Sequence, residues 1–153
     1  MRFSQRLLKS LCISALLIPT IVGAQQISND FRQRYGPPDN NGGFTVRPNI
    51  TAYVSYLSDG RVSRILIEPH ALEEREDSLV RNIGAELAVE IIDELSPIDR
   101  RGALVNSITF SAGCTSISVD DYERVRISRV LTCTLKGAIK SAEIVPKYSK
   151  PSQ

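Results

Sequence analysis

The stretch that decides the fold is residues 50–67, ITAYVSYLSDGRVSRILI. Its two halves are rich in β-branched and aromatic residues, and Asp59-Gly60 lies between them. An Asp-Gly pair between two such runs is a strong local signal for a β-hairpin, because both residues tolerate the backbone angles of a tight turn. The sequence therefore predicts an antiparallel pair of strands over 50–57 and 62–67.

An amphipathic helix is expected after this hairpin. Five apolar side chains recur at spacings of three and four residues, which places them along one side of a helix. They are Val80, Ile83, Leu87, Ile91 and Leu95. Asp77 or Ser78 can cap the first turn, and Pro97 cannot continue the helix.

Strands are expected again in the C-terminal half. One begins at Leu104 and ends near Ala112, residues 122–134 give one long strand, and 138–145 give a short last one. Hairpin connections favour antiparallel pairing. The order β-β-α-β-β-β therefore predicts an α+β fold, in which an antiparallel sheet of about five strands carries one amphipathic helix across one face.

Residues 1–24 have the layout of a cleaved export signal. Three basic residues precede an apolar run over 11–22, and small residues lie before Gln25. The basic end of such a segment stays in the cytoplasm while the apolar run enters the translocon. We expect cleavage near Ala24 and an exported protein of the periplasm or the extracellular fraction. An N-terminal membrane anchor is the alternative.

The rest of the chain divides into an adapter segment (25–43), a single α+β domain (44–146) and a flexible tail (147–153). The adapter ends in GPPDNNGG, which cannot continue a regular element. Loss of three basic side chains with the signal takes the net charge from +2 to just below zero. Nucleic-acid binding by bulk electrostatic attraction is therefore not expected, and neither is a membrane span in the mature chain.

Two cysteines follow the export signal, Cys114 and Cys133. An even pair in an exported chain usually forms a disulfide, and this one closes a loop of about 20 residues, worth about 3 kcal/mol. The spacing fits neither a CxxC redox centre nor a zinc site. We therefore expect a structural Cys114–Cys133 bridge, with a pair of free thiols as the alternative.

Side chains for catalysis are scarce. His70 is the single histidine, and its place after Glu68-Pro69 favours a surface turn. The chain contains no GxSxG elbow, no P-loop and no metal-ligand spacing, so the sequence predicts no enzyme, no cofactor and no metal site.

Acidic residues around the expected helix are the main alternative source of chemistry, in a carboxylate-based hydrolase or lyase. They are Glu73, Glu74, Glu76, Asp77, Glu86, Glu90, Asp93 and Glu94. A charged solvent face gives such residues little of the burial that acid–base catalysis needs, so the sequence favours a solvated helix face.

The best functional candidate is a surface. Arginine and tyrosine are expected to gather on the exposed sheet, and both residue types are common in binding hot spots. The candidate partner-binding residues are Arg124, Arg126, Tyr122, Arg61 and Arg64. The plainer interpretation is that arginine stems cover the sheet and that their charges protect strand edges from aggregation.

Several short motifs follow one another along the chain: RYGPP (34–38), FTVRP (44–48), IEP (67–69) and DYERV (121–125). This succession resembles small exported bacterial proteins of unknown function, and the resemblance implies no activity. The Asp-Gly-Arg-Val turn between two strands, followed by a helix and another strand, is similar in architecture alone to the periplasmic C-terminal domains of TonB-type energy transducers.

The first hypothesis is therefore a non-enzymatic binding domain whose partner is another envelope or secreted protein. The carboxylate-based hydrolase or lyase is the alternative. A secreted protease inhibitor is a third possibility, by analogy of fold.

Overall fold

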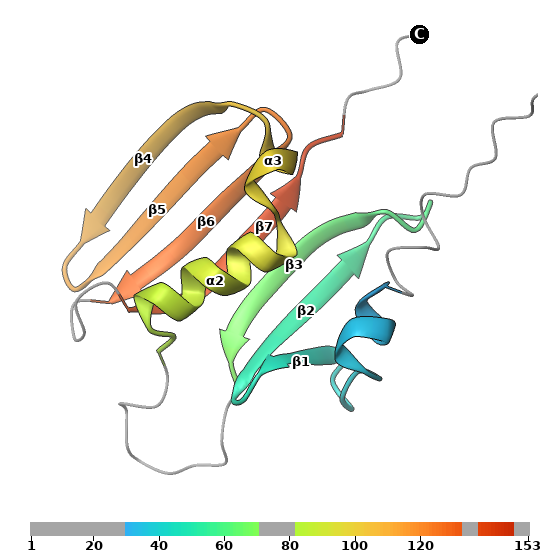
Figure 1. The fold of residues 1–153 in the computed structure, drawn as a ribbon. Helices are drawn as coiled ribbons and strands as arrows, with labels where there is room; N and C mark the ends of the chain where they lie inside the picture. Colours follow the sequence, from blue (N-terminus) through green and yellow to red (C-terminus); the bar gives the residue numbers. More distant parts are fainter. Residues whose placement is uncertain (1–29, 71–81, 133–137, 149–153) are drawn as a thin grey trace, which may run out of the picture.

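The computed structural model describes residues 30–70, 82–132 and 138–148. They form one antiparallel sheet with the strand order β1-β2-β3-β7-β6-β5-β4, so that β1 and β4 are its two edges (Figure 1). The strands are β1 (Gly43–Arg47), β2 (Ile50–Tyr56), β3 (Val62–Pro69), β4 (Leu104–Ala112), β5 (Thr115–Tyr122), β6 (Val125–Thr132) and β7 (Ile139–Pro146).

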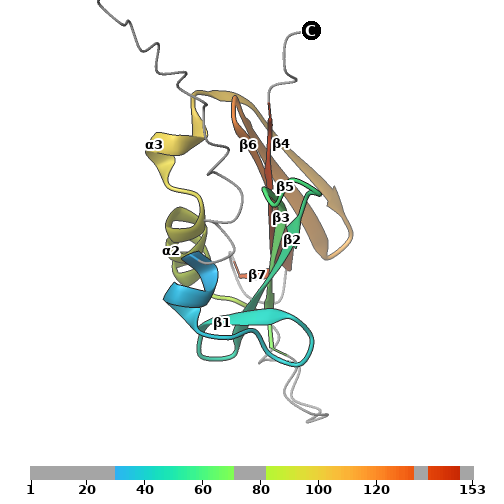
Figure 2. The ribbon, with the colours of Figure 1, turned by 90° about the vertical axis from the view of Figure 1, so that its right-hand side faces the viewer.

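The described residues also form three short helices, which are residues 30–35, α2 (Ala85–Leu95) and α3 (Ile98–Arg101). Figure 2 shows that all three lie on the same face of the sheet. We call this face the helix side and the opposite face the open side. The helices cover the middle of the sheet and the β1 end, and they leave the β4 end uncovered (Figure 1).

The expected sheet of about five strands with one helix is wrong. The sheet has seven strands in the described residues, because β1 and β5 are not recognisable from the sequence and because 122–134 is not one strand. The chain turns back at Glu123-Arg124, between β5 and β6. The β5 sequence, TSISVDDY, is mostly polar, so its alternation of apolar residues is reduced to Ile117 and Val119.

In the described residues α2 begins at Ala85, which is later than the start expected at Asp77 or Ser78. Ile83 has the right spacing for the apolar stripe, but it forms a β-bridge with Ile139, with N–H···O distances of 2.8 and 2.9 Å. Gly84 then caps the helix in an extended conformation. The two expected cap residues and Val80 lie outside the described residues.

The core lies between α2 and the helix side of the middle strands. Ile91 of α2 is buried, as are Ile67 of β3 and Ile144 of β7. Phe31 of the first helix packs against Phe44 of β1, with ring centroids 5.5 Å apart. Burial of this apolar surface is the main force that holds the helices on the sheet.

Beyond β6 the sheet extends past the core. Every residue of β4 is exposed. The turn from β4 to β5 has two residues, Gly113-Cys114, and Gly113 has a φ of 57°. A glycine with positive φ at the first position of a two-residue loop is typical of a type II′ turn, whose twist matches that of a hairpin. The β4–β5 hairpin is thus well specified even though little packs against it.

Candidate functional site

The five arginine and tyrosine residues predicted to bind a partner fall in three places. Arg64 on β3 and Arg126 on β6 share the open side, because each adjoins a residue buried on the helix side. Arg64 forms an ion pair with Glu143, and Arg126 forms one with Asp121 at 3.0 Å. Both charges are therefore already matched by neighbours on the same sheet face.

The other three residues lie elsewhere. Arg61, in the β2–β3 loop, forms an ion pair with Asp59 at 2.7 Å and lies 4.1 Å above the ring of Tyr148. Tyr122 ends β5, and its ring centroid lies 5.6 Å from the guanidinium carbon of Arg101. Arg124 is in the β5–β6 turn. The structure therefore does not bring the five residues together into one surface.

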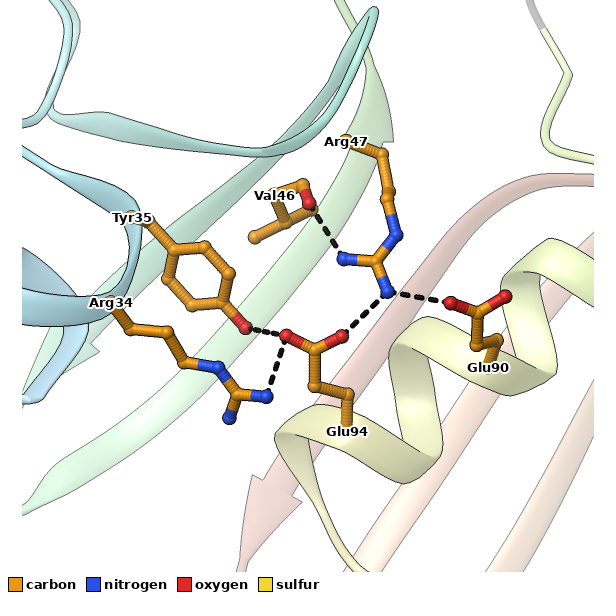
Figure 3. Close-up of polar contacts among 6 residues, drawn as sticks. All are labelled: Arg34, Tyr35, Val46, Arg47, Glu90 and Glu94. Atoms are coloured by element: carbon orange, nitrogen blue, oxygen red, sulfur yellow. Dashed lines mark hydrogen bonds and ion pairs between the residues drawn. The ribbon is translucent and has the colours of Figure 1, made fainter.

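Glu94 near the end of α2 is the centre of a polar cluster that ties three elements together (Figure 3). It accepts a hydrogen bond from the Tyr35 hydroxyl and an ion pair from Arg34 at 2.9 Å. Arg47 of β1 reaches Glu94 at 2.6 Å and Glu90 at 2.7 Å. These contacts hold α2 against the first helix and against edge strand β1.

The cluster also fixes the ionisation of its members. Burial raises the pKa of Tyr35 to about 12, and the hydrogen bond to Glu94 adds to the rise. Burial alone would raise the pKa of Glu94, but the Tyr35 hydrogen bond and the guanidiniums of Arg47 and Arg34 hold it below its ordinary value. Glu94 is therefore an ionised, fully engaged carboxylate near neutral pH, which suits a structural role better than proton transfer.

A cavity of about 460 Å³ lies beside this cluster, on the helix side. Its wall includes Tyr35 and Glu94, and its floor is made by buried aliphatic side chains of β3, β6 and β7. Three arginines line it, Arg34, Arg100 and Arg124. Of the five residues predicted from the sequence, Arg124 is the one that lines this cavity.

The open side of the β4–β5 hairpin carries an exposed apolar patch. Because Ile127 of β6 is buried on the helix side, its register partner Asp120 lies there too, and the neighbouring Val119 faces the open side. Register then places three further apolar residues of the hairpin on the same side. The β4–β5 patch consists of Ile108, Phe110, Ile117 and Val119.

Side chains of this patch are well exposed: Phe110 at 60%, Ile117 at 43% and Ile108 at 42%. The helix side of the same hairpin is polar instead, with Ser107 bonded to Asp120 and Ser111 bonded to Ser116. The apolar residues of the hairpin are therefore gathered on the face that no described helix covers.

The outer edge of β4 adjoins this patch and pairs with no other described strand. Its nine residues, LVNSITFSA, include no charge and no proline, which are the usual protections of an exposed edge. The opposite edge differs, because β1 is short, has an irregularity near Thr45 and carries Arg47. The sequence predicts a strand from Leu104 to near Ala112, but not its position at an edge.

The outward-facing groups of β4 follow from the turn. In a two-residue hairpin the flanking residues, here Ala112 and Thr115, form a hydrogen-bonded pair, and such pairs recur at every second position. The backbone N–H and C=O groups of Ser107, Thr109 and Ser111 therefore point away from β5. They are free to pair with an added strand.

Cys114 lies in this β4–β5 turn, whereas Cys133 lies outside the described residues, as does the expected export signal. The Cys114–Cys133 bridge and the cleavage near Ala24 therefore stay predictions. Within the described ranges no helix is long and apolar enough to cross a membrane. In the same ranges, no three His, Cys, Asp or Glu side chains gather in a way that would hold a metal ion.

Comparison with known proteins adds little. No protein-family model matches the chain. No curated protein matches it. The structure is similar to the crystal structure of a DUF4309 family protein (YjgB) from Bacillus subtilis subsp. subtilis str. 168, with a TM-score of 0.40 and 14% sequence identity. The similarity covers 78% of this chain and 77% of that chain, and it supports no argument about function.

Proposed function

We propose that this chain is a non-enzymatic binding domain of the cell envelope or secreted fraction, and that it binds an extended segment of a partner protein along the outer edge of β4. The observation that carries the proposal is the uncharged edge strand itself, exposed over all nine residues. Sheet edges of this kind add a further strand readily, because their backbone groups offer a ready set of hydrogen bonds.

The β4–β5 patch supplies the apolar contacts for such a segment. Exposed apolar patches on soluble domains commonly mark interaction sites, and aromatic residues such as Phe110 are enriched in their cores. The proposed partner segment lies antiparallel or parallel to β4, carries few charges and places apolar side chains on the open side. A charged segment would bury its charge beside Ile108 and Phe110, which is costly.

The export signal expected over residues 1–24 would bring this chain to a partner in the envelope or outside the cell. Composition of residues 1–24 supports that location. The helix side of the β4–β5 hairpin is polar, so the hairpin offers its apolar contacts on the open side.

The carboxylate-based alternative has weaker support. Three of the acids that the sequence singled out form ion pairs: Glu94 and Glu90 with Arg47, and Asp93 with Arg101 at 2.5 Å. Glu86 is exposed, and the other four lie outside the described residues: Glu73, Glu74, Glu76 and Asp77. Acid–base catalysis favours a carboxyl group whose pKa is raised towards neutrality, and the pKa of Glu94 is lowered instead.

The test places a photocrosslinking aromatic amino acid at position 110 of the full chain in its native host. A second change is then made at Thr109, whose N–H points away from β5. Thr109→Pro removes that donor, and an edge strand tolerates a proline at such a position. Thr109→Val keeps the donor and is the matched control.

We expect one partner protein to be crosslinked in the Thr109→Val chain and lost in the Thr109→Pro chain. Mass spectrometry then identifies the crosslinked peptide as an extended, weakly charged segment. Equal crosslinking in both chains contradicts pairing along the edge. Crosslinks between two copies of this chain would mean that the edge serves self-association, which also contradicts the proposal.

A further inference from the structure

We propose that the cavity beside Glu94 binds an anionic amphiphile, with an apolar body on the cavity floor and a carboxylate or phosphate head against Arg100 and Arg124. This site lies on the helix side, away from the outer edge of β4, and is independent of the partner binding proposed above. Its volume of about 460 Å³ falls within the range of small-ligand sites.

The floor of the cavity suits an aliphatic or aromatic body. It includes Val62 and Ile65 of β3, Val125 of β6 and Ile144 of β7, which are all at most 5% exposed. These side chains come from neighbouring strands and have no polar atoms beyond the backbone. An apolar ligand body placed there removes its own surface from water, which is favourable in proportion to the area buried.

The head group is indicated by the arginines. Arg34 already forms an ion pair with Glu94. Arg100 and Arg124 line the cavity, and neither side chain forms an ion pair or hydrogen bond with any described residue. Two guanidiniums at the lip of an apolar cavity offer paired hydrogen bonds to a planar or tetrahedral anion.

The backbone holds these two arginines close together. Arg100 lies in α3, and Arg124 lies in the β5–β6 turn. The Arg124 N–H donates to the carbonyl of Arg101 at 3.0 Å, which joins the turn to the end of the helix. The Lys147 N–H donates in turn to the Arg124 carbonyl at 2.7 Å. Both guanidiniums therefore start from one fixed backbone junction.

Acidic groups at the cavity do not cancel this charge. Glu94 is matched by Arg34 and Arg47, so its charge is already neutralised. Asp30 also lines the cavity and is exposed. Its single negative charge is outnumbered by Arg100 and Arg124, which leaves an excess of positive charge at the cavity for one anionic head. A cationic or neutral amphiphile would leave that excess uncompensated.

The test measures binding of dodecanoate, dodecyl phosphate and dodecanol to the full mature chain by calorimetry, below the concentrations at which they form micelles. We expect both anions to bind at least about tenfold more tightly than the alcohol, a difference that two charge-assisted contacts readily provide. The tighter of the two anions identifies the head group as carboxylate or phosphate.

Variants then locate the site. Arg100→Gln with Arg124→Gln is expected to weaken binding of the anions about tenfold or more and to leave dodecanol unchanged. Arg64→Gln with Arg126→Gln removes the same charge from the open side and is the matched control. Ser96→Phe places a bulky ring at a half-buried lining position and is expected to abolish binding of all three compounds.

Four outcomes overturn the proposal. The first is that none of the three compounds binds to the wild-type chain. The second is that the alcohol binds as tightly as the anions. In the third, the control pair of variants weakens binding as much as the Arg100 and Arg124 pair. In the fourth, the compounds bind only to a chain that ends at Tyr148, which makes residues 149–153 the occupant of the cavity.

Discussion

Phe110 on β4 and Ile117 on β5 are register partners, and both side chains remain exposed on the open side of the sheet. A cross-strand pair of this kind stabilises the hairpin by only a fraction of a kcal/mol, about 0.2–1 kcal/mol. The two side chains therefore contribute more to a surface that another molecule can cover than to the fold of the free chain.

Phe110→Thr is expected to separate these two contributions. Because Phe110 is exposed and threonine suits a strand, the free energy of unfolding should change by less than about 0.5 kcal/mol. Partner capture should weaken by about tenfold or more.

Ile127→Ala is the contrasting variant, because Ile127 is buried and its truncation should cost about 2–5 kcal/mol. Urea denaturation and quantitative crosslinking measure the two effects. A large loss of stability in Phe110→Thr would contradict this account.

The disulfide prediction follows from the β5–β6 register as well as from cysteine number. Thr115 of β5 pairs with Thr132 of β6. Cys114 directly precedes Thr115 in the sequence, and Cys133 directly follows Thr132. We expect an intramolecular Cys114–Cys133 bridge, and Cys114→Ser should lower the free energy of unfolding by about 2–4 kcal/mol. Reduction of the wild-type chain should lower it equally. If the reducing agent has no effect on wild-type unfolding, the two cysteines are free thiols.

The lowered pKa of Glu94 predicts that the free energy of unfolding depends on pH. Its folded pKa lies below the ordinary value of 4.5, so its contribution is fully present above that pH and is lost as the pH falls through the folded pKa. Glu94→Gln should therefore be less stable than wild type at neutral pH, by about 1–3 kcal/mol, and the difference should shrink in acid. Denaturation at a series of pH values measures this.

Glu86→Gln is the control for that series, because Glu86 lies exposed in the first turn of the same helix. Its change in stability should be small, since only an exposed charge near the helix start is lost, worth about 0.3–1 kcal/mol. A Glu94→Gln difference that is the same in acid and at neutral pH would show that the polar cluster does not depend on the ionised carboxylate.

Substitution by alanine should have a large effect on stability at one glycine and a small effect at another. A Cβ atom at Gly43 would lie 2.3 Å from Cγ2 of Thr51 and 2.9 Å from Cε1 of Tyr53, so Gly43→Ala should displace β1 and cost about 1–3 kcal/mol. A Cβ atom at Gly84 meets no atom within 4 Å, so Gly84→Ala should change stability by less than about 1 kcal/mol. Thermal unfolding of both variants distinguishes them; equal effects would be inconsistent with the close approach of β1 to β2.

The parts of the fold that the sequence predicts correctly are those specified by residues close together in the chain. The β2–β3 hairpin is confirmed: Asp59-Gly60 lies in the loop, and Gly60 has a φ of 82°. The apolar stripe of Leu87, Ile91 and Leu95 is confirmed in α2. In both cases the pattern and the turn residues lie within about 20 residues of one another.

Contacts between distant segments account for what the sequence does not predict. Ile83 has helical spacing, but pairing with Ile139 holds it outside the helix. The pairing of β3 with β7 leaves β4 at the far edge, and nothing within 104–112 indicates that position. The cavity likewise joins residues from both halves of the chain, so its arginines could not be grouped from their spacing.

Amide hydrogen exchange over β4 tests the central claim most directly, in the free chain and in complex with the crosslinked partner. In the free chain the outward N–H groups of Ser107, Thr109 and Ser111 should exchange rapidly, because no described strand accepts them. Binding should slow all three by about tenfold or more, while the amides of β1 stay unchanged. Unchanged exchange at these three residues in the complex, with protection appearing elsewhere on the chain, would contradict strand addition at β4.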